Sequence, residues 1–198
     1  MRVFMRQRRR RKLSLVFLFV FFFLGSPLQI AAQQDDKRIE AIRRLSKQVN
    51  EQIEESERVE EGTGIYCNEL IVNKGDKSWT AVGIYRTVIK FYYTYGDREK
   101  NPYPNRLLKI TVTTRRSDRH EYAEYLFNTA EQLIFHYQKD GESATSEIRN
   151  YFAGETLIRR MLGQRTVATK SRATLDAARS ALREKNKLRE IFVRSVGD

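Results

Sequence analysis

The stretch WTAVGIYRTVIKFYYTYGDREKNPYPNRLLKITVTT, residues 79–114, decides the fold class of this chain. Aromatic and β-branched residues dominate both of its ends, which is typical of β-strands. A polar loop with two prolines separates the ends, so we expect two neighbouring antiparallel strands, the first of them bent near Gly83. Alternation in the second strand, LLKITVTT, places Leu108, Ile110 and Val112 on one face of the sheet.

Five more strands are expected in addition to this pair. One precedes it and ends at a turn over residues 73–76. Four follow it, with turns at residues 116–118 and at Asp140-Gly141 among the connections. Short turns between consecutive strands predict an antiparallel meander of about six or seven strands over residues 62–164.

Amphipathic helices are predicted at both ends of this meander. Residues 33–61 contain no glycine, proline or aromatic residue, and their apolar positions recur at spacings of three and four. These positions are Ile39, Ile42, Leu45, Val49 and Ile53. Residues 165–198 show a second apolar stripe and carry nine basic and four acidic residues. The second stripe consists of Leu175, Ala178, Ala181, Leu182, Leu188, Ile191, Phe192 and Val196.

The predicted fold class is therefore α+β, an antiparallel meander flanked by an N-terminal and a C-terminal amphipathic helix. Residues 33–198 are long enough for one domain with its own core. Both helices are expected to cover the same face of a curved sheet.

Residues 1–32 have the three parts of a secretory signal peptide. Basic residues crowd positions 1–12, an apolar run follows from Leu13 to Leu24, and small residues precede the polar start after Ala32. As a helix, the apolar run spans roughly 18 Å, which is short of a hydrocarbon core of about 30 Å. We therefore expect cleavage after Ala32 and export to the periplasm or the medium. An uncleaved single-pass anchor is the alternative.

This leader carries much of the positive charge. The chain has a net charge of +12, but seven of its 37 basic residues lie in the leader, so residues 33–198 keep only +5. A nucleic-acid partner is therefore not expected, and a membrane contact is expected only through the leader.

Cys67 is the one cysteine of the chain, which excludes an internal disulfide. We expect a small buried residue within its strand, with an intermolecular disulfide as the alternative. The chain also lacks an Asn-x-Ser/Thr acceptor for N-glycosylation, which favours a bacterial origin.

His120, His136 and Asp118 are the candidate catalytic residues. Two imidazoles and a carboxylate could run acid–base chemistry. The histidines fall on neighbouring predicted strands, but a change of one residue in register would put them on opposite faces. Their spacing matches no metal-binding motif, so no metal site and no cofactor are expected.

Arginines are candidate binding residues. Arg115, Arg116 and Arg119 surround one predicted turn, and Arg159 and Arg160 lie together on a later strand. Guanidinium groups bind carboxylates and phosphates, although arginines also serve as solvated ends and edges of sheets.

Tyrosines are the other candidate binding residues. In FYYTY, residues 91–95, alternation puts Phe91, Tyr93 and Tyr95 on one face. An exposed aromatic row of this kind could stack on sugar rings or on a peptide. Beneath a helix, the same row would be part of the core.

These features favour an exported, non-catalytic domain that binds a protein, a glycan or an anionic polymer in the cell envelope or outside the cell. The chain has no nucleophile elbow, phosphate-binding loop or dinucleotide-binding glycine pattern. The alternatives are a small secreted hydrolase that uses His120 and His136, and a single-pass membrane protein that keeps its leader.

Overall fold

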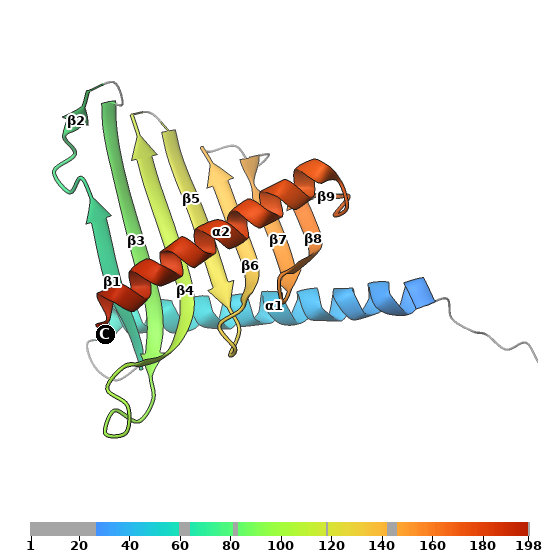
Figure 1. The fold of residues 1–198 in the computed structure, drawn as a ribbon, viewed down its shortest axis with the longest axis horizontal. Helices are drawn as coiled ribbons and strands as arrows, with labels where there is room; N and C mark the ends of the chain where they lie inside the picture. The colour runs from blue at the N-terminus through green and yellow to red at the C-terminus, as the bar shows by residue number, and fades with distance from the viewer. Residues whose placement is uncertain (1–26, 60–63, 81–82, 118, 142–145, 198) are drawn as a thin grey trace, which may run out of the picture.

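The computed structural model describes residues 27–59, 64–80, 83–117, 119–141 and 146–197, with the backbone alone for 27–32. Two helices and nine strands are found in this part of the chain (Figure 1). The helices are α1 (Pro27–Arg58) and α2 (Arg172–Ser195). The strands are β1 (Ile65–Val72), β2 (Ser78–Trp79), β3 (Gly83–Tyr95), β4 (Pro104–Arg116), β5 (Arg119–Phe127), β6 (Leu133–Asp140), β7 (Ile148–Ala153), β8 (Thr156–Leu162) and β9 (Arg165–Val167).

The strands form one antiparallel sheet in the order β1-β3-β4-β5-β6-β7-β8-β9, and β2 pairs with the beginning of β3. The predicted α+β meander is confirmed, with nine strands where six or seven were expected. The two additional strands, β2 and β9, have two and three residues, too few to show an alternating pattern. β9 also lies inside the segment predicted as the C-terminal helix. The helix begins at Arg172, not at residue 165.

The two helices lie on opposite faces of the sheet, so the molecule has three layers (Figure 1). The expectation that both helices cover one face is wrong. The central strands are apolar on both faces: in β3, Phe91 and Tyr93 pack beneath α2, while Tyr92 packs against α1. Two apolar faces need two covering layers, because an uncovered one would leave the hydrophobic side chains in water.

The N-terminal helix packs through the predicted stripe. Ile39, Ile42, Val49 and Ile53 are buried, and Leu45 packs beside them.

The predicted leader falls largely outside the described residues. The α1 side chains that the structure describes as buried lie after Ala32, so a cut at that residue would leave this packing of α1 in place. No helix in the described ranges is long and apolar enough to cross a membrane.

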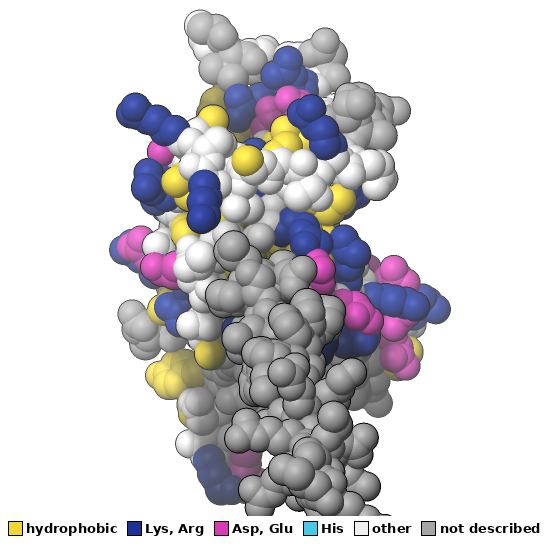
Figure 2. Space-filling view, turned by 90° about the vertical axis from the view of Figure 1, so that its right-hand side faces the viewer, with side chains coloured by type: hydrophobic (Ala, Val, Ile, Leu, Met, Phe, Trp, Pro, Cys, Tyr) yellow, Lys and Arg dark blue, Asp and Glu magenta, His cyan; other side chains and the backbone are white. Residues whose placement is uncertain are grey.

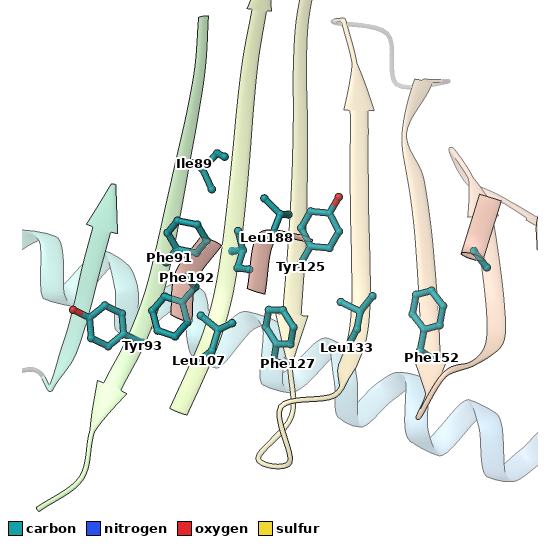
Figure 3. Packing of buried hydrophobic residues seen from close by; sticks show 12 residues of the cluster. Ile89, Phe91, Tyr93, Leu107, Tyr125, Phe127, Leu133, Phe152, Leu188 and Phe192 are labelled. Atoms are coloured by element: carbon teal, nitrogen blue, oxygen red, sulfur yellow. The ribbon is translucent and has the colours of Figure 1, made fainter. Parts of the chain in front are cut away.

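The C-terminal helix is capped by Ser171, whose Oγ accepts a hydrogen bond from the Thr174 amide at 3.3 Å. Its aromatic anchor is Phe192, whose ring lies 5.6 Å from that of Phe91 (Figure 3). The buried residues of the predicted stripe are Ala178, Ala181, Leu188 and Phe192. Leu175 and Ile191, which the sequence also placed in the stripe, are exposed.

A bulge in β4 changes which residues share a face. Tyr92 pairs with Lys109, but Tyr93 pairs with Leu107, so Leu108 is left as the extra residue. Leu108 therefore packs on the α1 side, whereas Ile110 packs on the α2 side. The prediction that these two residues share a face is wrong for this reason.

Candidate functional site

A row of four polar side chains crosses the sheet beneath α2. Tyr125 on β5 pairs with His136 on β6, His136 pairs with Asn150 on β7, and Asn150 pairs with Arg160 on β8. Directly opposed residues in antiparallel strands point to the same face, so the four side chains lie side by side. On the other side of Tyr125, the row continues with the apolar residue Ile110 of β4.

Asn150 fixes the orientation of the whole row. Its side chain is 1% exposed, and its Oδ1 accepts a hydrogen bond from Arg160 Nη1 at 3.0 Å. A guanidinium can only donate, so the amide NH₂ faces His136 Nδ1, at 2.9 Å. The amide NH₂ also only donates. His136 Nδ1 must therefore accept, and the neutral imidazole carries its proton on Nε2.

Burial keeps this imidazole neutral. His136 is 5% exposed, and burial, helped by the charge of Arg160, lowers its pKa to about 4. A protonated imidazole would carry a second N–H that faces the amide donors of Asn150, and it would lose the bond that orients it. At neutral pH, His136 is thus a fixed hydrogen-bond donor through Nε2.

The helix covers the row with short side chains and leaves a pocket of about 540 Å³. Ala177, Ser180 and Ala181 of α2 form its roof, and Glu184 lies at one end. Figure 3 shows the hydroxyl of Tyr125 turned away from the apolar cluster. Burial, and then the nearby Glu184 carboxylate, raises the pKa of this tyrosine, so the hydroxyl keeps its proton.

Two polar atoms that line this pocket, both on buried residues, have no hydrogen-bond partner among the described residues. Neither the Tyr125 hydroxyl nor His136 Nε2 makes a hydrogen bond within the described part of the chain. Neither atom is among the fully buried side-chain atoms without a partner, so both are open to the pocket. Unpaired donors that line a pocket are therefore groups through which a ligand can be held.

A larger pocket of about 650 Å³ lies on the other face, between α1 and β6–β8, and its charged side chains have partners within the chain. Arg43 donates to the Tyr151 hydroxyl at 3.3 Å, and Arg149 pairs with Glu147. Lys47 pairs with Glu51 along α1 at 3.7 Å.

The α1 face also holds a buried ion pair. Lys109 Nζ lies 2.8 Å from Glu124 Oε2, with 7% and 10% of the two side chains exposed. The same Nζ donates to Asn50 Oδ1 of α1 at 2.7 Å, and the Tyr122 hydroxyl donates to Glu124 at 3.3 Å. Lys109 thus ties α1 to the sheet and takes no part in the basic turn at Arg115.

The structure does not bring the two candidate catalytic histidines together. His136 points to the α2 face with Tyr125, while His120 lies on β5 at a position of opposite parity and points to the α1 face, where it is exposed. Asp118 lies outside the described residues. No group of three or more metal-ligating side chains occurs in the described ranges.

Each candidate arginine of the turn has an acidic neighbour. Arg115 pairs with Asp76 at 2.9 Å, Arg116 approaches Glu121 at 3.6 Å, and Arg119 approaches Asp140 at 3.7 Å. The turn is therefore locally neutralised.

Basic residues elsewhere are also interspersed with acids. On the side of the molecule next to β9, Figure 2 shows Lys and Arg side chains among Asp and Glu. Arg179, Lys187 and Arg194 of α2 pair with acids of the same helix.

The two candidate tyrosines belong to the region covered by α2. Tyr93 is 5% exposed, and its hydroxyl donates to Asn68 at 3.0 Å. Tyr95 is half-buried and packs against the same cluster, with the Arg98 guanidinium 4.1 Å from its ring centroid. Tyr66 on β1, whose ring contacts those of Tyr93 and Tyr95, is 40% exposed.

Cys67 is exposed, so the expectation of a buried residue is wrong. The reason is its place on β1, which pairs with β3 alone and forms one edge of the sheet. Partial burial of the sulfur still raises the pKa of the thiol, which makes it a poorer nucleophile at neutral pH.

Sequence reasoning found two members of the polar row and missed two. His136 and Arg160 stand out by residue type, but Tyr125 and Asn150 look like ordinary strand residues in EYLF and RNYF. The pairing register that joins the four side chains depends on loop geometry, which the sequence does not display.

No protein-family model matches this chain, and no curated protein or solved structure shows significant similarity to it.

Proposed function

We propose that this protein is exported and that it binds, without catalysis, a small polar ligand in the pocket beneath α2. The observation that carries this proposal is the pair of unpartnered polar atoms, the Tyr125 hydroxyl and His136 Nε2, that line a pocket of about 540 Å³. A pocket of this size suits a small metabolite or one unit of a polymer.

Export is supported by the leader, with its basic start, apolar run and small residues before Ala32. The ligand would then come from the periplasm or the medium, and a bacterial envelope is the favoured setting. A binding role agrees with the fixed geometry of the row, because Asn150 holds His136 in one orientation and one protonation state. Such preorganisation lowers the entropic cost of binding.

The test is native mass spectrometry of the protein recovered from the extracytoplasmic fraction of its host. We expect a small molecule that stays bound under native conditions and is released on unfolding. Ser180→Trp should lose it, because Ser180 is an exposed α2 residue at the pocket and an indole there would close the opening.

Ala173→Trp is the matched control, since it adds the same bulk at an exposed α2 position outside the pocket. This variant should keep the small molecule. A wild-type protein that carries none, or equal retention by both variants, would refute the proposal. Recovery of a full-length, membrane-bound species would instead refute export by cleavage.

A further inference from the structure

We infer that the ligand is held through an anionic group, a carboxylate or a phosphate, which lies against Arg160 and accepts from His136, while the Tyr125 hydroxyl holds another part of the ligand. This inference rests on the proposed function and deepens it by naming the chemistry of the ligand.

Arg160 has donors to spare. It is half-buried, its one hydrogen bond goes to Asn150 Oδ1, and no carboxylate lies within 4.0 Å of it among the described residues. A guanidinium carries five N–H donors, so most of them remain free for a ligand. Its neighbour Arg159 differs: it points to the opposite face and pairs with Asp36 of α1 at 2.5 Å.

The other free groups in the pocket are donors too. The orientation of Asn150 leaves His136 with its proton on Nε2, and the Tyr125 hydroxyl can give its proton to an acceptor. A group that only donates, such as an ammonium, would find one acceptor among these three groups, the Tyr125 hydroxyl oxygen. An anionic group accepts from Arg160 and His136, and charge-assisted bonds from a guanidinium to a carboxylate or phosphate are among the strongest in proteins.

The pocket has an electrostatic direction. Arg160 lies on β8, whereas Glu184 lies close enough to Tyr125 on β5 to raise the pKa of its hydroxyl. Three strand spacings of about 4.8 Å separate these two strands. The anionic group therefore belongs at the β8 end, and a hydroxyl or ammonium group of the same ligand would meet Glu184 at the other end.

The two histidines of the chain make this testable by nuclear magnetic resonance. His136 reports on the pocket, and the exposed His120 reports on anions that gather at the basic turn. At pH 7 and constant ionic strength, we would titrate the protein with succinate and, separately, with inorganic phosphate. We expect a saturable shift of the His136 Cε1–H signal with at least one of them. The probe that binds more tightly identifies a carboxylate or a phosphate as the natural group.

Arg160→Gln should weaken this binding at least tenfold, because it removes the charge and keeps a side chain of similar shape. Arg159→Gln is the matched control, with the same loss of charge one residue away on the opposite face, and it should bind as the wild type does.

A His136 signal that stays unchanged with both probes, or equal loss of binding in the two variants, would overturn the inference. The proposed function can survive that result. If Arg160→Gln retains the natural small molecule as the wild type does, the pocket binds a ligand and only the anionic contact is refuted.

Discussion

Lys109→Met is expected to lower the free energy of unfolding by about 3–5 kcal/mol, because it leaves the buried carboxylate of Glu124 without its partner. The side chain of Glu124 is 10% exposed, so water cannot replace the ammonium group. The substitution also removes the hydrogen bond from Lys109 to Asn50, which holds α1 against the sheet. Urea unfolding at pH 7 measures this loss.

The double variant Lys109→Met/Glu124→Leu should recover most of the lost stability, since two apolar side chains replace a buried ion pair at little cost. Arg44→Met is the surface control. It breaks the Arg44–Glu40 pair of α1, whose side chains are 71% and 66% exposed, and should cost less than about 1 kcal/mol. A cost for Lys109→Met as small as that of Arg44→Met would contradict the buried placement of the pair.

The second large effect is a loss of stability in acid that depends on His136. Its pKa falls from 6.5 to about 4 in the folded protein. Above pH 6.5, neither the folded nor the unfolded chain protonates this imidazole, and its contribution is complete. As the pH falls from 6.5 towards 4, the unfolded chain takes up the proton first, so stability is lost, by about 3 kcal/mol at the limit.

His136→Gln should remove this part of the pH dependence, because glutamine does not titrate. The measurement compares urea unfolding at neutral pH and near pH 4, and the quantity that matters is the change with pH in each variant. His120→Gln is the control, since it makes the same substitution at an exposed position outside the pocket, and it should follow the wild type. Equal acid sensitivity of wild type and His136→Gln would show that burial of His136 is not the cause.

The sequence was a good guide wherever a local pattern decides the structure. The spacing of Ile39, Ile42, Val49 and Ile53 identified the buried stripe of α1, and alternation identified the seven longer strands. The sequence did not predict how the helices and the sheet pack together. Placing the helices required the knowledge that β3 buries both Phe91 and its neighbour Tyr92, and periodicity alone does not show that both faces are covered.

The candidate site was less predictable for a physical reason. Its four members are 10 to 14 residues apart in sequence from one strand to the next and become neighbours only through the pairing register. The bulge at Ile134 in β6 shifts that register, and a shift of one residue would move Tyr125 away from His136. Arg159 and Arg160 illustrate the point. They are neighbours in sequence, but Arg159 forms an ion pair with Asp36, whereas Arg160 bonds to Asn150 and has no acidic partner among the described residues.

The most direct test of the account is a ¹H–¹⁵N correlation spectrum of the two histidine rings as a function of pH. The pocket can select an anion only if His136 presents Nε2–H to it, which requires Nδ1 to accept from Asn150. We predict a neutral His136 with its proton on Nε2 at pH 7, unchanged until the pH approaches 4. A His136 ring with its proton on Nδ1, or a His136 ring that titrates near pH 6.5, would contradict the orientation of Asn150 and, with it, the proposed chemistry of the pocket.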